Sequence, residues 1–158
     1  MTIDRIEARF LIMSDLHVFS KEQQNKEIVA KFLAHCEKFE FESAWEFVSD
    51  DFHYRNHPFP GTNTKETSLK QLKILVGSLD TFIIKIHQMA ADGDTVLNER
   101  SDIFIGRFFH IDLPVYGVFK LRDGKIYEWR DNFDFLTLMI ASLKSPFVVI
   151  SKLFGKEV

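Results

Sequence analysis

The chain has 158 residues, of which 46% are hydrophobic and 27% charged, as in an ordinary globular protein of one domain. Its formal net charge of −3, with acidic and basic residues interspersed, offers no positive stripe for phosphates, so nucleic acid is not an expected partner. Cys36 is the single cysteine, which excludes an intrachain disulfide and a thiolate metal cluster and fits a reducing compartment, by default the cytoplasm.

Residues 1–20 are predicted to form an N-terminal extension ahead of the first helix. The apolar patch at residues 10–13 is preceded by acidic and basic side chains and lacks a signal-peptide core, so no targeting signal is expected. Ser20 followed by Gln23 has the pattern of a capping box, and apolar residues then recur at helical spacing. The first helix is therefore expected over about residues 21–37.

The next segment reads as a helix, a strand and a second helix. A short helical stretch over residues 43–48 is followed by an alternating segment at 52–56, which predicts a strand that stops before Pro58. After a turn at Pro58, Pro60 and Gly61, either Asn63 or Thr64 is expected to cap a further helix. The apolar side of that helix carries Leu69, Leu72, Leu75, Val76 and Leu79.

From Thr81 onward the hydrophobic pattern has period two, which is typical of a sheet. Turn residues at 92–94 and 123–124 divide it into a hairpin, whose second strand is residues 95–104, and two further antiparallel strands, the last over 125–134. Helices followed by a sheet predict one α+β domain over residues 1–158.

Residues 135–154 are strongly apolar, but Lys144, Pro146 and Lys152 interrupt them well short of the ~20 clean residues that a spanning helix needs. The apolar segment 136–158 is therefore expected as a C-terminal helix or tail that packs on its own domain or on a second copy. The alternatives are a pocket lid and a membrane-surface helix. Membrane association is less expected than packing on protein.

Charged side chains fall on strand faces that are otherwise apolar. Side chains two apart share a face, which groups the following three sets: Phe52, Tyr54, Asn56; Val96, Asn98, Arg100, Asp102, Phe104; and Tyr127, Trp129, Asp131, Phe133. A lone buried carboxylate costs several kcal/mol or takes up a proton. If Arg100 bridges Asp102 and Asp131, one retained proton makes the trio neutral and supplies one acid and one base.

Several other interpretations fit single features of the sequence. The trio could be a salt bridge on a wet sheet face, a buried Asp could serve an isomerase or dehydratase, or a Phe-rich pocket could carry a sterol or fatty acid. His53 and His57, with His87 or His110, could be imagined as metal ligands, but strand geometry and Pro58 favour surface histidines and no metal. Cys36 is expected to be a core residue without chemistry.

Three short motifs carry a family resemblance. They are Tyr54, Arg55, Asn56; NERSD at residues 98–102; and WRDNFD at residues 129–134. Together they resemble limonene-1,2-epoxide hydrolase, over about residues 27–135. The resemblance implies an NTF2-like cone, in which N-terminal helices pack on a strongly curved mixed or antiparallel sheet around an apolar pocket.

The resemblance also implies roles for five polar residues. Asp131 is the base that activates water, Tyr54 and Asn56 hold that water, Asp102 is the acid toward the epoxide oxygen, and Arg100 bridges the two carboxylates. Trp129, Phe104 and Phe133 are expected to line the substrate pocket. The implied reaction is addition of water to an apolar epoxide in one step, with no covalent intermediate, metal or cofactor, in a homodimer.

Overall fold

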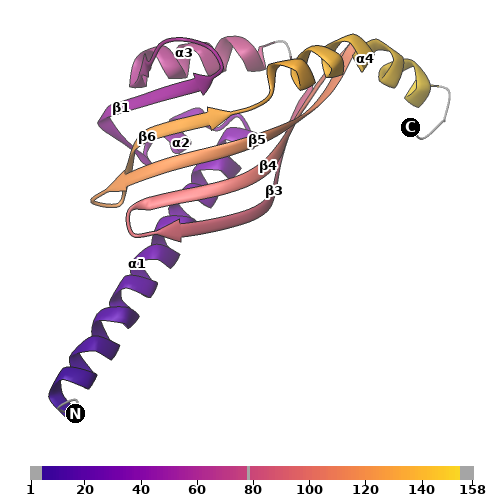
Figure 1. Cartoon of the computed structure of the whole chain (residues 1–158). Coiled ribbons are helices and arrows are strands. Elements are labelled where there is room, and N and C mark those ends of the chain that lie inside the picture. The colour runs from indigo at the N-terminus through magenta and orange to yellow at the C-terminus, as the bar shows by residue number, and fades with distance from the viewer. Residues whose placement is uncertain (1–4, 78, 154–158) are drawn as a thin grey trace.

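The structure, a computed structural model, describes residues 5–77 and 79–153. Helices precede and follow a single sheet (Figure 1). In chain order the elements are α1 (Arg5–Glu37), α2 (Phe41–Trp45), β1 (Val48–His57), β2 (Asn63–Thr64), α3 (Lys65–Val76), β3 (Thr81–Asp92), β4 (Thr95–Gly106), β5 (Phe109–Arg122), β6 (Lys125–Asn132) and α4 (Phe135–Leu153).

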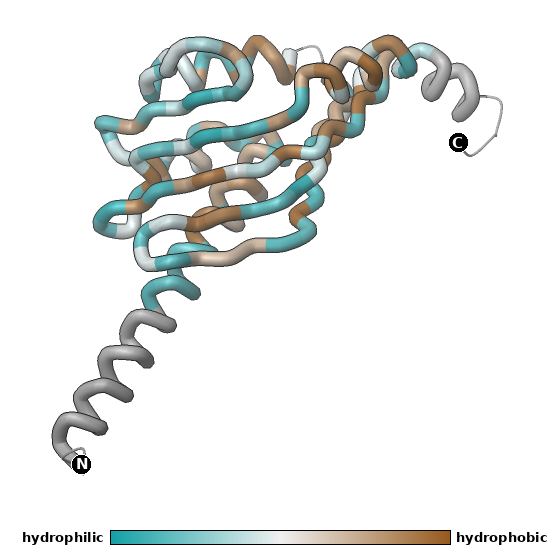
Figure 2. The backbone as a smooth tube through the Cα atoms, in the orientation of Figure 1, coloured by the Kyte–Doolittle hydropathy of each residue, from teal (hydrophilic) through white to brown (hydrophobic). Residues whose placement is uncertain are grey.

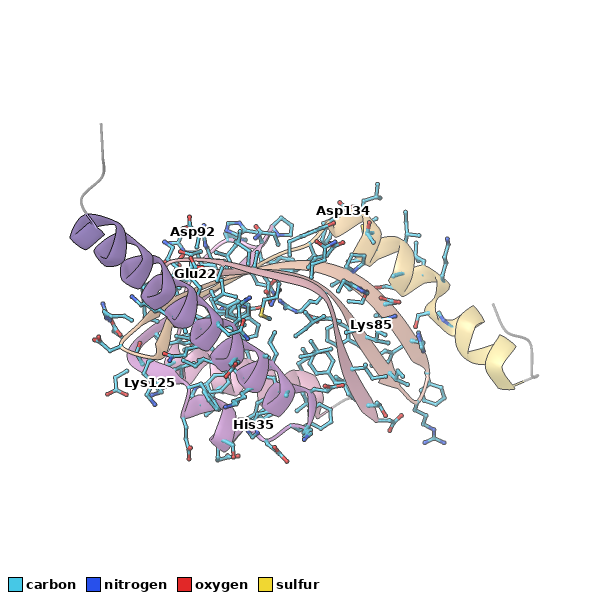
Figure 3. All side chains as sticks on the ribbon, turned by 90° about the horizontal axis from the view of Figure 1, so that it is seen from below. Glu22, His35, Lys85, Asp92, Lys125 and Asp134 are labelled. Atoms are coloured by element: carbon cyan, nitrogen blue, oxygen red, sulfur yellow. The ribbon has the colours of Figure 1, made fainter. Side chains whose placement is uncertain are left out.

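The sheet has six strands in the order β2-β1-β6-β5-β4-β3. Strands β1 and β6 run parallel, and the other neighbours are antiparallel, so the sheet is mixed. Helix α1 crosses one face of this sheet (Figure 3), and its buried residues follow the helical spacing expected of a core-facing side. These residues are Val29, Phe32, Leu33 and Cys36.

Helix α1 begins at Arg5, not near residue 21, so the prediction of a helix start at Ser20 was wrong. Residues 5–20 contain no glycine or proline, and nothing in that segment stops helix propagation. The predicted extension is therefore largely the first half of α1, which projects away from the sheet (Figure 1), and its residues 1–4 lie outside the described part of the chain.

The short elements before β3 differ in their limits from the prediction. Helix α2 ends at Trp45, and Val48 already belongs to β1, where it pairs with Ile126 of β6. Thr64 caps α3 as expected, because its side chain accepts a hydrogen bond from the Thr67 backbone N–H. Helix α3 ends at Val76, so Leu79 lies beyond it.

Both predicted strand turns are present, and the second carries a bulge. Lys120 pairs with Glu128 and Leu121 with Ile126, which leaves Tyr127 as the extra residue of β6. Ile126 therefore points into the core, while Tyr127 lies against Arg122 and His53. The prediction that Tyr127 shares the inward face with Trp129 was wrong, because the bulge shifts the alternation by one residue.

Strand β6 ends at Asn132, and the exposed Asp134 then caps α4 by accepting hydrogen bonds from the backbone N–H groups of Leu136 and Thr137. Helix α4 packs on β5, where the Ser145 hydroxyl accepts from the His110 backbone N–H. The end of the predicted apolar tail, residues 154–158, lies outside the described residues. Among the helices described, none has both the length and the apolar character to cross a bilayer.

Candidate active site

A cavity lies between the sheet and helices α1 and α3, with about 650 Å³ free of protein atoms when its open mouth is included. Most of its wall is apolar and comes from both helices and from the inward faces of the strands. This wall comprises Leu33, Cys36, Phe41, Leu72, Leu75, Val76, Leu79, Phe82, Ile84, Phe104, Leu113, Val115, Trp129 and Phe133. The polar part of the wall consists of Tyr54, Asn56, Arg100, Asp102 and Asp131.

The polar groups meet because of the strand register. Asn56 of β1 pairs with Asp131 of β6, Asp131 pairs with Gly117 of β5, and Gly117 pairs with Asn98 of β4. These four positions form one row across the sheet. Arg100 is two residues further along β4, on the same face as Asn98.

Arg100 joins the two carboxylates. Its Nε and Nη2 donate to Oδ1 and Oδ2 of Asp102 at 2.8 and 3.1 Å, and Nη2 also donates to Oδ2 of Asp131 at 2.7 Å. Its Nη1 donates to Oδ1 of Asn98 at 3.2 Å. A bidentate contact of this kind fixes both the distance and the plane of the Asp102 carboxyl group.

The trio is withdrawn from solvent. Arg100 is 1% exposed, Asp102 7% and Asp131 5%. Burial raises the pKa of Asp102 and outweighs the opposing effect of the Arg100 guanidinium. Burial by itself would lower the pKa of Arg100, but Asp131 and then Asp102 hold it above its ordinary value, so the guanidinium stays charged.

Asp131 accepts hydrogen bonds from three side chains. Besides Arg100, the Trp129 Nε1–H donates to its Oδ1 at 2.7 Å and the Tyr54 hydroxyl donates to its Oδ2 at 3.3 Å. Burial, reinforced by the charge of Asp131, raises the pKa of Tyr54 well above its ordinary value. Tyr54 is therefore a neutral donor throughout the accessible pH range.

Asn56 brings an unused acceptor to the cavity. Its Oδ1 is buried and has no hydrogen-bond partner among the described residues. Because Asn56 is the register partner of Asp131 and lines the same cavity, this oxygen can accept a hydrogen bond from a small molecule held beside Asp131. A water molecule is small enough, and it can donate one hydrogen bond to Asn56 and one to Asp131.

Gly117 provides the space through which Arg100 reaches Asp131. Strand β5 lies between β4 and β6, so the Arg100 side chain must cross it, and a Cβ on Gly117 would lie 2.5 Å from the Arg100 Nη1. Sequence reasoning missed this residue. A glycine inside a strand pattern is the signal that could have identified a close approach.

All eight residues predicted for the site line this one cavity, including Phe104, Trp129 and Phe133. The hydrogen bond from Trp129 to Asp131 was not predicted, since Trp129 was expected only as wall. Of the proposed histidine ligands, His53 lies 3.5 Å from Glu128 and His87 lies 3.0 Å from the Ser101 hydroxyl. Within the described residues, no three potential metal ligands are grouped.

The chain is similar in sequence to known epoxide hydrolases. Residues 23–144 match the limonene-1,2-epoxide hydrolase catalytic domain. The chain is 36% identical over 109 residues to epoxide hydrolase EphG of Mycobacterium tuberculosis. The aligned region covers 67% of this chain and 70% of EphG.

Similarity to solved structures supports the same fold. An LEH-like epoxide hydrolase from M. tuberculosis superposes with a TM-score of 0.74 and 27% identity, covering 85% of this chain and 98% of that one. A protein with a ketosteroid isomerase-like fold from Catenulispora acidiphila gives 0.66 and 17%, covering 73% and 92%. The architecture is thus the NTF2-like α+β fold, a long N-terminal helix on a six-stranded mixed sheet.

Proposed function

Because this chain belongs to the limonene-1,2-epoxide hydrolase family and is an epoxide hydrolase, we propose that it adds water to a small or medium-sized apolar epoxide in one push-pull step. The product is a vicinal diol. The observation that carries the proposal is the buried Arg100 bridge between Asp102 and Asp131, in a cavity whose remaining wall is largely apolar.

Asp131 acts as the general base. Its two oxygens already accept from three donors, which fixes the carboxylate beside the unpartnered Oδ1 of Asn56. A water molecule held between Asp131 and Asn56 gives one proton to Asp131 while its oxygen forms a bond to an epoxide carbon. Tyr54, which stays protonated, helps to hold the water and the base.

Asp102 acts as the general acid. Burial raises the pKa of Asp102, which favours the protonated form that a general acid needs, and the carboxyl group faces the same cavity from β4. As the epoxide C–O bond breaks, the electron pair goes to the oxygen, which takes the Asp102 proton and becomes a hydroxyl. Afterwards Asp131 loses its proton and Asp102 regains one, so the pair of carboxyl groups holds one proton before and after turnover.

Arg100 keeps this arrangement neutral. One guanidinium and two carboxyl groups that share one proton carry no net charge, which limits the cost of burying them. A carrier of sterols or fatty acids has no need of such a buried acid and base, and an isomerase of the same fold needs only one of them. The second carboxyl group therefore supports water addition over both alternatives.

The partners follow from the same proposal. The substrate is an apolar epoxide with water, and the protein works without a metal or organic cofactor as a single domain. We further propose a homodimer formed through the outer face of the sheet, where Leu97 and Tyr116 are exposed. The buried Cys36 fits the reducing cytoplasm as its location.

Incubation with a panel of apolar epoxides in oxygen-labelled water tests the function. We expect one labelled oxygen in the diol, and loss of turnover by about 10²–10⁴-fold in Asp131→Asn, because an amide cannot accept the proton of water. Asp134→Asn is the matched control, since Asp134 is exposed and asparagine also caps helices. Diol formation at the unaltered rate in Asp131→Asn would remove the assigned base, and tight retention of epoxide without turnover would support the carrier.

A further inference from the structure

As far as Pro146, where its side chains are described, helix α4 has most of its large apolar side chains on the side away from the protein. Its protein-facing side consists of small or polar residues with one leucine, and these are half-buried or buried: Thr137, Leu138, Ala141 and Ser145. The opposite side is exposed and largely apolar, with Ser142 and Lys144 at its edges. Its apolar residues are Phe135, Leu136, Met139, Ile140 and Leu143. Leu143 is 72% exposed and Leu136 58%. We call these five residues the α4 apolar face.

This arrangement is the inverse of a normal surface helix, which buries its apolar stripe. The α4 apolar face is continuous, because its members are three or four residues apart or adjacent on one side of the helix. The same helix is visible as a mostly hydrophobic segment beyond the sheet in Figure 2. An apolar strip of this kind on a protein surface marks a contact with a partner or a membrane.

The charged side chains of helix α4 itself are basic, whereas the exposed acids Asp134 and Asp112 lie at its start and on β5. Helix α4 contains Lys144 and Lys152 and no acidic residue, although the whole chain has a net charge of −3. The turn between β4 and β5, which precedes the Ser145 contact of His110, adds Arg107 and the 71% exposed Phe108. The Arg107 guanidinium lies 5.1 Å from the Phe108 ring. The acidic Asp134 precedes the helix, and its carboxylate accepts a hydrogen bond from the Thr137 backbone N–H at the N-terminus of α4.

The α4 apolar face is also connected to the cavity by a row of aromatic rings. Phe135 contacts Phe59, with ring centroids 6.1 Å apart, and Phe59 contacts Phe133 at 5.8 Å. Phe133 lines the cavity, whereas Phe59 and Phe135 are exposed. These three phenylalanines thus form a continuous apolar path from the outside of the protein to the wall of the cavity.

We propose that the α4 apolar face docks on an anionic phospholipid bilayer, lying in the plane of the interface, with Lys144 and Arg107 at the headgroup level. Apolar side chains with flanking lysine and arginine are the combination that holds a helix at such an interface. Delivery of a membrane-dissolved epoxide along Phe135, Phe59 and Phe133 rests on the proposed function, whereas docking itself does not. Helix α4 packs on β5 of its own domain through its other side, as expected from the sequence, and the proposal concerns the apolar face that this contact leaves exposed.

Sedimentation of the full chain with vesicles tests the docking. We expect binding to phosphatidylcholine vesicles that contain phosphatidylglycerol, weaker binding to pure phosphatidylcholine, and release by high salt. Leu143→Glu should lower the partition coefficient by more than about tenfold, since it places a charge at the centre of the apolar face. Ile74→Glu is the control, because Ile74 is 67% exposed on α3, and should bind as the unaltered chain does.

Lys144→Glu separates charge from apolar contact. It reverses one charge on the helix and should weaken binding to anionic vesicles on the order of tenfold while leaving binding to pure phosphatidylcholine unchanged. Any of three results would overturn the proposal. They are an equal loss of vesicle binding in Ile74→Glu, no vesicle binding by the unaltered chain, and vesicle binding that neither α4 variant changes. An oligomer that Leu143→Glu dissociates in the absence of any vesicle binding would also overturn it, because it would show that a second copy covers the face.

Turnover distinguishes this proposal from the proposed function. Leu143→Glu should hydrolyse a water-miscible epoxide at the unaltered rate and convert a bilayer-dissolved epoxide more slowly, in proportion to its lost vesicle binding. Failure of the unaltered chain to hydrolyse either epoxide would contradict the proposed function and leave the vesicle-binding result valid.

Discussion

Gly117 lies directly beneath the guanidinium of Arg100, so closely that a Cβ at this position would be 2.5 Å from Nη1 of Arg100 and 2.5 Å from Oδ1 of Asn98. Strand β5 separates the strands that carry Arg100 and Asp131, and the missing side chain allows the guanidinium to cross it. The contact between two charged groups on non-neighbouring strands therefore depends on a residue that has no functional group.

Gly117→Ala should consequently displace Arg100. The new methyl would meet three buried side chains, those of Arg100, Asn98 and Phe119, and overpacking of this kind costs about 1–3 kcal/mol in the free energy of unfolding. A shift of the bridge by about 1 Å should lower the rate of epoxide hydration by roughly 10²-fold. Urea denaturation and steady-state rates measure the two effects. Gly77→Ala is the control, because Gly77 has ordinary clearance at the end of α3, and should leave both quantities near their starting values.

Arg100→Ala should abolish turnover and destabilise the fold by about 3–5 kcal/mol, because it leaves two buried carboxyl groups without a counter-charge. Denaturant midpoints and diol formation are the measurements. Arg122→Ala provides the comparison, since Arg122 also contacts a carboxylate, Asp51, but on the exposed surface, and its removal should have no measurable effect on either. A stable and active Arg100→Ala variant would mean that the bridge is needed neither for catalysis nor for the stability of the fold.

The raised pKa of Asp102 predicts a pH dependence of both rate and stability. The acid must be protonated, so the rate should fall as the pH rises through the folded-state pKa of Asp102. Its proton is bound more tightly in the folded chain, so the stabilising contribution is complete below the unfolded pKa of about 3.9 and is lost as the pH rises through the folded value. Asp102→Asn should lose activity with epoxides whose oxygen is a poor leaving group. It should also remove this pH-dependent contribution to stability. An unchanged rate in Asp102→Asn would identify another acid.

Trp129→Phe tests the indole N–H that holds Asp131. The substitution retains an aromatic ring against Phe119, whose centroid lies 5.6 Å away, but deletes the 2.7 Å hydrogen bond to Oδ1. We expect a loss of about 1–3 kcal/mol in stability and a lower kcat with KM little changed, because a positioning role affects the base more than substrate binding. A raised KM at constant kcat would instead assign Trp129 to the pocket wall alone.

The inward faces of the strands were predictable because period two survives in β1 and β4. The face with Asn98, Arg100 and Asp102 is buried as expected, and the positions beside it are more exposed. Five polar residues from three distant segments could therefore be assigned to one cavity before their contacts were known. Their catalytic roles, like the strong curvature expected of the sheet, stay predictions.

Other features depend on events that leave little trace in local pattern. The start of α1 at Arg5 follows from the absence of a helix breaker rather than from a positive signal at Ser20. The bulge that turns Tyr127 outward arises from pairing with β5, and the close approach of Arg100 to Gly117 arises from side-chain paths across three strands. The bulge and the close approach are tertiary effects that one segment alone does not encode.

The parallel pairing of β1 with β6 has a consequence for synthesis on the ribosome. Tyr54 is synthesised 77 residues before Asp131, so its hydroxyl cannot contact the carboxylate until β6 has been made. Until then the nascent polypeptide has neither the proposed base nor the middle of its sheet, since β6 is the strand that joins β1 to β5. We therefore expect a translation product that ends before Asp131 to be inactive.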